Sequence, residues 1–184
     1  MPDFSIRPAL AGDVAAITRI YAEAVRHGTA SFELEPPDEA EMARRYQALV
    51  AGLYPFLVAE QGGSTSGSDV LGRKVLGYAY AGPYRARPAY RFTVEDSIYI
   101  APAAQRRGIG RALLDRLMVE SQARGFRQMI AVIGDSAQTP SIALHEAAGF
   151  RLVGTFEAVG FKFGRWLDSV LMQRSLGDGA TTAP

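Results

Sequence analysis

The stretch QRRGIGRALLDRLMVESQARGF, residues 105–126, decides the fold. It opens with two adjacent arginines, turns through two glycines and continues with the spacing of an amphipathic helix. Cations at a helix start cost about 0.3–1 kcal/mol each, because unpaired N–H groups and the positive end of the dipole already lie there. We therefore predict that an anion binds between Arg106, Arg107, Arg111 and the helix start. Solvated arginines beside a tight turn are the alternative.

Two nucleotide-binding motifs do not fit this turn. A Walker loop requires G-x-x-x-x-G-K-[ST], which occurs nowhere in the chain. A dinucleotide fingerprint, G-x-G-x-x-G, would need glycine where the chain has Leu113. It would also follow the first strand of a βαβ unit, whereas several predicted strands precede this turn.

Length and composition indicate one ordinary globular domain. The chain has 184 residues, of which 48% are hydrophobic and 21% charged. A formal net charge of +1 gives no general attraction to nucleic acid or membranes, so we expect neither as a partner. The chain has no cysteine and only two histidines, which argues against thiolate catalysis and any metal site. Without a signal peptide or a membrane-spanning run, we expect a cytoplasmic location.

Hydrophobic patterns predict alternating strands and helices, which indicates an α/β or α+β domain over residues 1–176 with helices on both faces of a sheet. Composition predicts a flexible hairpin insertion at 62–73 and a disordered tail at 177–184. We expect strands at 4–10, 54–61, 74–84, 91–102 and 128–133, two more within 151–176, and helices at 11–25, 39–51, after the glycine turn, and at 141–150.

QRRGIG resembles the signature [QR]-x-x-G-x-[GA] of the GNAT superfamily of N-acyltransferases. Five more segments resemble its phosphinothricin acetyltransferase branch, in the right order: TASFELEPP, AYAGPYRARPAY, TVEDSIYI, VIGDSAQTPSIALHEAAGF and GFKFGRWLDSVLMQ. The resemblance covers 5–174 except 62–73. It implies the GNAT fold, a mixed, mostly antiparallel twisted sheet of about seven strands between helices, and a homodimer. It also identifies the bound anion as the pyrophosphate of acetyl-CoA.

The resemblance assigns acetyl-CoA to three segments. The glycine turn would hold the pyrophosphate, and the strand SIYI would pair with the pantetheine arm as an added strand does. At the third segment the chain has Gln138 where the family commonly has Asn, and Ser141 as a helix N-cap is an alternative. The expected cofactor contacts are Ile98, Tyr99, Ile100, Arg106, Arg107, Gly108, Ile109, Gly110, Arg111, Gln138 and Ser141.

Glu95 is the candidate general base, because acetyl transfer needs a deprotonated amine. Strand alternation places Glu95, Ser97 and Tyr99 on one face, opposite Asp96, for which we expect a structural role. A carboxylate in mid-strand is unusual, although a solvent-facing or ion-paired glutamate is the alternative. In the resembled family this glutamate is the general base.

His145 is the second catalytic candidate, because the family places its histidine beside the reaction centre. A satisfied core histidine is the alternative, and His27 is expected at the surface. The resemblance further implies that the loop before the catalytic strand binds the anionic end of the acceptor, with solvated loop cations as the alternative. The expected acceptor-binding residues are Phe32, Arg85, Ala86, Arg87 and Glu95.

These residues predict acetyl transfer from acetyl-CoA to the α-amino group of a small amino acid or analogue, of the phosphinothricin, methionine sulfoximine or methionine sulfone type. Without a cysteine to carry the acetyl group, we expect direct transfer in a ternary complex. Acetylation of a protein N-terminus or another amine is one alternative, and the arginines argue against a polyamine. A non-catalytic acyl-CoA-binding module is another, against which Glu95 argues.

Overall fold

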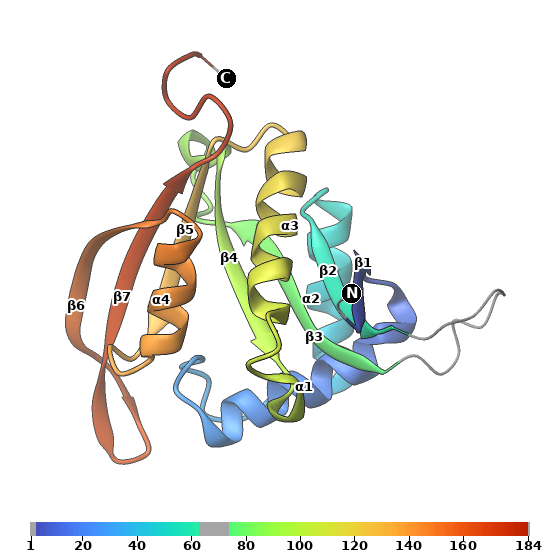
Figure 1. The fold of residues 1–184 in the computed structure, drawn as a ribbon. Helices are drawn as coiled ribbons and strands as arrows, with labels where there is room; N and C mark the ends of the chain where they lie inside the picture. The colour runs from blue at the N-terminus through green and yellow to red at the C-terminus, as the bar shows by residue number, and fades with distance from the viewer. Residues whose placement is uncertain (1–2, 63–73, 184) are drawn as a thin grey trace, which may run out of the picture.

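One seven-stranded sheet crosses the protein in the order β1-β2-β3-β4-β5-β7-β6 (Figure 1). A computed structural model describes residues 3–62 and 74–183. Of the paired strands, β4 and β5 run parallel and the other neighbours antiparallel, which confirms the predicted mixed, mostly antiparallel sheet. The strands are β1 (Phe4–Pro8), β2 (Phe56–Gln61), β3 (Val75–Pro83), β4 (Thr93–Ile100), β5 (Gln128–Gly134), β6 (Arg151–Lys162) and β7 (Arg165–Ser175).

Helices cover both faces of the sheet, as predicted. α1 and α2 pack on one face, where Tyr78 is fully buried, and α3 lies on the other face with α4 beside it (Figure 1). The α-helices are α1 (Val14–His27), α2 (Glu39–Ala51), α3 (Ile109–Ala123) and α4 (Thr139–Ala147), and short 3-10 helices occupy Ala11–Asp13, Pro88–Tyr90 and Pro102–Ala104. In the described part of the chain, no helix is long and apolar enough to cross a membrane.

α3 follows from the pattern of the opening stretch. Its apolar stripe is fully or almost fully buried against the sheet, and this face drives helix formation more than the propensity of the residues. The predicted amphipathic spacing is confirmed, because the inner face of the helix is buried and consists of Ile109, Leu113, Leu114, Leu117, Met118 and Ser121.

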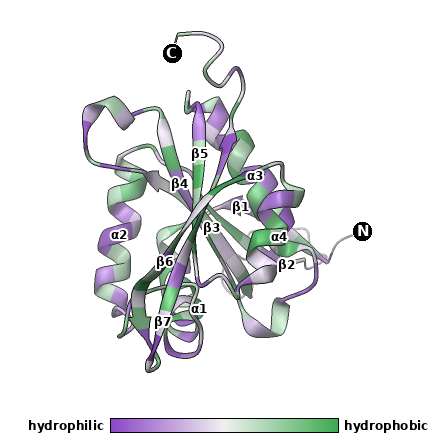
Figure 2. Ribbon diagram, turned by 90° about the vertical axis from the view of Figure 1, so that its left-hand side faces the viewer, coloured by the Kyte–Doolittle hydropathy of each residue, from purple (hydrophilic) through white to green (hydrophobic). Residues whose placement is uncertain are grey.

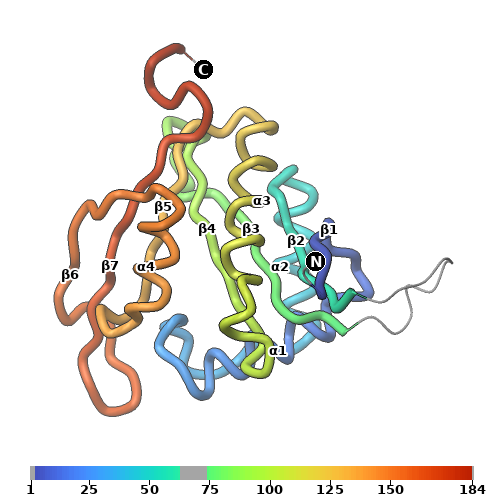
Figure 3. Tube along the Cα trace, in the orientation of Figure 1, coloured from blue at the N-terminus to red at the C-terminus, as the bar shows by residue number. Residues whose placement is uncertain are grey.

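β4 and β5 part halfway along their length (Figure 3). Their register runs from the pair Thr93 and Gln128 to the pair Asp96 and Ala131, and stops there. β4 nevertheless remains paired with β3 as far as Ile100. The centre of the sheet is therefore split at the end where α3 begins.

β6 forms the edge of the sheet and carries an apolar surface, part of which appears as green segments in Figure 2. On this hairpin with β7, the rings of Phe161 and Trp166 meet with their centroids 5.2 Å apart. Edge strands are normally protected from pairing with other chains, and this one is both long and hydrophobic. The exposed apolar side chains of β6 and the following turn and strand are Leu152, Val153, Phe156, Val159, Phe161, Phe163 and Trp166.

Two predicted segments need comment. The hairpin insertion at 62–73 lies almost wholly outside the described residues. Residues 177–183 follow turns beside the end of β7, and the disorder that we expect for the tail stays a prediction. Arg127 contacts this tail through the Thr182 hydroxyl and the carboxylate of Asp178, at 3.0 and 3.4 Å, and Leu176 is buried.

Candidate active site

The split between β4 and β5 exposes one side of a strand in the middle of the sheet. Residues 97–100 pair with β3 on one side, while their other side has no strand partner among the described residues. We call this open side of residues 97–100 the slot. The side chains of these residues are half-buried, so the slot is only partly exposed to solvent. An extended polar chain placed here could receive strand-like hydrogen bonds. The predicted pantetheine contacts Ile98, Tyr99 and Ile100 all lie in this slot.

The glycine turn brings unpaired N–H groups to the mouth of the same slot. Gly108 is left-handed, with φ of 77°, and its carbonyl accepts the first α3 bond, from Ala112 at 3.1 Å. None of the described residues accepts a hydrogen bond from the N–H groups of 108–111. A Cβ added to Gly110 would stand 3.9 Å from the Ile100 side chain and 3.5 Å from Leu144. The unpaired N–H groups of the glycine turn, the end of β4 and α4 therefore lie close together.

The three predicted arginines are not equivalent. Arg106 is exposed and has no partner within the described residues. Arg107 pairs with Asp3 at 2.5 Å, and this hydrogen bond holds the pKa of Asp3 below its ordinary value. Both side chains are solvent-accessible, so the pair is weak and Arg107 can exchange its partner for a phosphate. Sequence reasoning missed Asp3, because nothing in the chain order places residue 3 beside residue 107.

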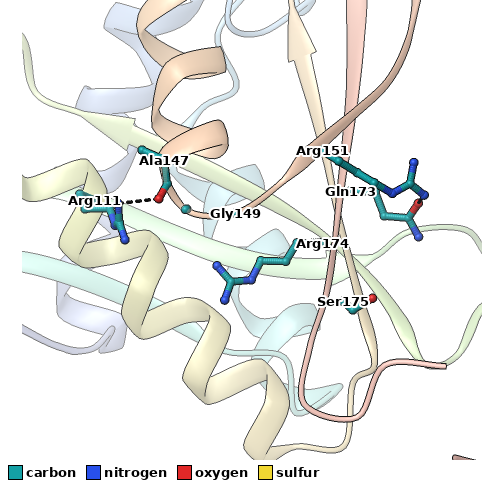
Figure 4. A pocket seen from close by; sticks show the side chains of 8 residues that line it. Arg111, Ala147, Gly149, Arg151, Gln173, Arg174 and Ser175 are labelled. Atoms are coloured by element: carbon teal, nitrogen blue, oxygen red, sulfur yellow. Dashed lines mark hydrogen bonds between the residues drawn. The ribbon is translucent and has the colours of Figure 1, made fainter. Parts of the chain in front are cut away.

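Arg111 joins α3 to α4 (Figure 4). Its guanidinium donates to the carboxylate of Asp115 at 2.8 Å and to the carbonyl of Ala147 at 3.0 Å. On the far side of this bridge lies a hollow of about 550 Å³. Arg111 is the one predicted site residue among its lining, so the hollow is separate from the slot. Its lining residues are Arg111, Ala147, Ala148, Gly149, Arg151, Gln173, Arg174 and Ser175.

Glu95 lies on the α1 and α2 face of β4, half-buried next to Tyr80. Burial raises the pKa of Glu95, the charge of neighbouring Asp96 raises it further, and Arg85 opposes both. A carboxylate whose pKa is moved toward neutrality is a better proton acceptor than an ordinary one. The position and the raised pKa both suit the general base that we predict.

Tyrosines surround this face of the sheet, which sequence reasoning did not anticipate. Tyr99 meets Tyr21 edge-on with ring centroids 5.0 Å apart and stacks on Tyr78 at 5.3 Å. Tyr78 and Tyr80 are two positions apart on β3 and therefore lie on the same face of the sheet. This spacing could have revealed the cluster from sequence. Next to it, a cavity of about 40 Å³ is lined by Tyr21, Met42, Arg45, Tyr46, Leu49, Phe56, Tyr78 and Tyr80.

His145 lies on the opposite face of the sheet from Glu95 and is only 4% exposed. Its Nε2 is 3.0 Å from Asp96 Oδ2, and its Nδ1 is 2.8 Å from the carbonyl oxygen of Ser141. A carbonyl only accepts, so Nδ1 carries a proton and donates it. The structure therefore separates the two catalytic candidates and gives His145 the buried, satisfied setting of a core histidine.

The Asp96–His145 pair is a buried hydrogen-bonded ion pair, with the side chains of His145 and Asp96 5% and 2% exposed. Burial lowers the pKa of His145, but the hydrogen bond and charge of Asp96, together with the Ser141 carbonyl, outweigh it and leave the pKa raised. Oδ1 of Asp96 is buried and has no hydrogen-bond partner among the described residues. The structural role that we predict for Asp96 is therefore to hold α4 against β4, at the point where β4 and β5 separate.

Apart from Glu95 on β4, the predicted acceptor residues lie in two loops. Arg85, Ala86 and Arg87 are exposed in the connection from β3 to β4, with the Arg85 guanidinium 5.1 Å from the centre of the Tyr84 ring. Phe32 follows α1, is 38% exposed and lies over the end of β5. A Cβ added to Gly134 would come within 2.8 Å of the Phe32 ring.

Gln138 and Ser141 have roles that sequence reasoning did not assign. Gln138 is the N-cap residue of α4, so Ser141, inside the first turn, is not its N-cap. The Gln138 side-chain amide donates to the Thr29 hydroxyl at 3.0 Å, which ties α4 to the loop after α1. Ser141 instead offers its carbonyl to His145. The predicted contact of both residues with the cofactor stays a prediction.

Comparison with known proteins agrees with this geometry. The phosphinothricin N-acetyltransferase of Alcaligenes faecalis is 55% identical over 173 residues, covering 94% of this chain and 82% of the relative. The L-methionine sulfoximine/L-methionine sulfone acetyltransferase of Salmonella typhimurium is 40% identical, covering 96% of each chain. The crystal structure of a GNAT superfamily phosphinothricin acetyltransferase from Sinorhizobium meliloti in complex with AcCoA superposes with a TM-score of 0.89 at 50% identity, covering 99% of this chain and 93% of that one.

The profile of the acetyltransferase (GNAT) family matches residues 15–150. This range contains the split of the sheet, the glycine turn and both catalytic candidates. The chain therefore belongs to the acetyltransferase (GNAT) family.

Proposed function

We propose that this protein is an acetyl-CoA-dependent N-acetyltransferase that acts on the α-amino group of a small amino acid or analogue, such as phosphinothricin, methionine sulfoximine or methionine sulfone. One observation carries the proposal: a half-open central strand and the unpaired N–H groups of a helix start meet at one slot. The names of the relatives support the acceptor class, and the AcCoA complex of the Sinorhizobium meliloti protein supports the cofactor.

The residues of the slot fit the chemical groups of acetyl-CoA. Free N–H groups at 108–111, with Arg106 and Arg107, suit a pyrophosphate, and the open edge at 97–100 suits the amides of pantetheine. When bound, acetyl-CoA supplies a thioester that an amine can attack. In the described part of the chain, no group of three or more His, Asp and Glu side chains could hold a metal ion.

We propose that Glu95 removes a proton from the ammonium of the acceptor, so that the free amine can attack the thioester carbonyl directly. The new amide bond would replace the C–S bond of the thioester, and CoA would leave as a thiolate that takes up the second proton of the amine. The open N–H groups of β4 are placed to polarise the carbonyl oxygen. With no cysteine to carry the acetyl group, transfer takes place in a ternary complex. We keep His145 in this proposal as a second acid–base group, and its Nε2 faces Asp96 on the side of β4 opposite Glu95.

Two pairs of arginines should affect opposite substrates. Arg85→Ala/Arg87→Ala should raise the KM of the amino-acid acceptor about tenfold or more and leave the KM of acetyl-CoA unchanged, because a guanidinium–carboxylate bond is worth about 1.5–3 kcal/mol. Arg106→Ala/Arg107→Ala should raise the KM of acetyl-CoA instead. Steady-state kinetics with each substrate varied in turn measures both effects. The matched control is Arg116→Ala/Arg124→Ala, in the middle and at the C-terminal end of α3.

The same assay separates free amino acids from protein N-termini. An amino-acid amide resembles a peptide N-terminus, because it keeps the α-amine and lacks the carboxylate. We expect the wild type to use the amide poorly and the Arg85/Arg87 variant to distinguish little between the two forms. Equal use of acid and amide by the wild type would contradict recognition of the carboxylate and favour acetylation of protein N-termini.

We also propose a homodimer, formed through the apolar hairpin of β6 and β7. Support comes from the exposed aromatic side chains there, of which Trp166 is 64% exposed, since monomers rarely expose such a continuous patch. Trp166→Asp should convert the dimer to a monomer in sedimentation-velocity runs. Val119→Asp, at an exposed apolar position on α3, is the control and should sediment as a dimer like the wild type. A wild type that sediments as a monomer contradicts the proposal. The cytoplasmic location stays a prediction.

A further inference from the structure

Lys162, at the end of β6, has its charged ammonium group inside the protein. It is 3% exposed, and its Nζ donates to the carbonyl oxygens of Gly28 at 2.9 Å and Ser31 at 2.7 Å. Among the described residues, no carboxylate lies within ion-pair distance of it. Burying an ammonium is costly unless its donors are satisfied. Here two backbone carbonyls of one short loop accept two of its three N–H donors, and the ammonium lies 5.0 Å from the centre of the Phe163 ring.

The segment 28–33 is a loop without helix or strand, and residues outside the loop hold it at three points. Lys162 binds its backbone, Gln138 donates to the Thr29 hydroxyl at 3.0 Å, and the hydroxyls of Tyr21 and Ser31 lie 2.9 Å apart. Two of the three points come from beyond residue 130 in the chain. Such a loop adopts its shape only in the folded protein, and it then keeps that shape before any ligand arrives.

Phe32 is the side chain that this arrangement places. It follows directly after Ser31, whose carbonyl Lys162 binds, and its ring covers the α-carbons of Gly134 and Gly160. A Cβ added to either glycine would overlap the ring, so the two strands leave a space that Phe32 fills. A loop that moved by an ångström would remove the ring from this space, and misplacements of that size cost about 10²-fold in well-ordered sites.

We propose that Lys162 is a positioning residue for the acceptor: its buried ammonium anchors the backbone at 28–31, so that Phe32 forms a preset wall against the side chain of a small amino acid. The inference rests on the proposed function, because it takes Phe32 to line the acceptor pocket. It goes beyond that function in assigning acceptor selectivity to a residue that does not touch the acceptor. Loss of the anchor should therefore affect the acceptor and spare acetyl-CoA.

The chain offers a matched control, because Lys74 is its other lysine and is exposed. Lys162→Met keeps the length of the side chain but removes its donors. We expect a rise of about tenfold or more in the acceptor KM, with the KM of acetyl-CoA unchanged. Discrimination against bulky amino acids should weaken as well. Lys162→Arg, which keeps a charged donor, should restore part of the effect, and Lys74→Met should match the wild type.

Hydrogen exchange read by mass spectrometry tests the anchor without activity. In Lys162→Met the peptide that covers 28–33 should exchange faster while α3 exchanges as in the wild type. An unchanged exchange rate overturns the anchor, and faster exchange with an unchanged acceptor KM overturns its effect on the acceptor. A wild type that acetylates no amino acid refutes the proposed function instead. If Lys162→Met does not fold, Thr29→Val, which removes the Gln138 contact, carries the test: an unchanged exchange rate and acceptor KM then overturn the proposal.

Discussion

Glu95→Gln is expected to lower turnover by about 10²–10⁴-fold while acetyl-CoA binds as before. Glutamine keeps the size and the polarity of the side chain but cannot take a proton from an ammonium. Because the pKa of Glu95 is raised by burial and by Asp96, the wild-type rate should fall as pH decreases through this raised pKa. The variant should lack that acidic limb.

Rates measured over a pH series, with acetyl-CoA affinity from calorimetry, check this expectation. Glu157→Gln, at an exposed position on β6, is the control for loss of a carboxylate as such. Turnover of Glu95→Gln within a few-fold of the wild type would mean that another group is the base. An acidic limb that persists in the variant would lead to the same conclusion.

His145→Ala is expected to destabilise the folded protein by about 3–5 kcal/mol, because it leaves the buried carboxylate of Asp96 without its partner. Removing both side chains should cost less than the sum of the single changes, since no uncompensated charge then remains. His27→Ala is the matched control, because His27 is the other histidine and is largely exposed. Urea denaturation measures the free energy of unfolding for each variant.

The pH dependence of this stability has a definite sign. The pKa of His145 in the folded protein lies above its ordinary value of 6.5, so the folded state binds the proton more tightly than the unfolded state. The contribution is complete below pH 6.5 and is lost as pH rises through the folded pKa. His145→Ala should abolish this decline. A variant that is as stable as the wild type but inactive would show that His145 serves catalysis rather than the fold.

The fold was largely predictable from sequence, because its patterns are local. The stripe of α3 and the alternation of Val94, Glu95 and Asp96 follow from periodicity, and the structure confirms both. A helix start with arginines likewise has a local physical meaning. Sequence also placed Asp96 and Glu95 on opposite faces of β4 correctly, since a strand leaves no other choice.

The contacts of the site were less predictable, because they join residues far apart in the chain. Nothing near His145 indicates that Asp96 holds it, and the resemblance placed this histidine beside the reaction centre. Nothing near Arg111 indicates that it also donates to the Ala147 carbonyl of α4, and its contact with the phosphate stays a prediction. From sequence alone, Lys162 would be taken for an exposed strand residue. Its burial depends on the loop at 28–31, which is far away in the chain.

The burial of Lys162 also limits non-enzymatic acetylation of the protein. Thioesters acetylate exposed amines slowly without any enzyme, and this protein is proposed to work in constant contact with one. Its only lysines are Lys74 and Lys162, and all the other side chains counted among its 20 Lys and Arg are arginines, whose guanidinium stays protonated and does not act as a nucleophile. Since Lys162 is enclosed, Lys74 is the one lysine amine left open to the solvent. The protein thus carries its positive charge in a form that its own cofactor does not consume.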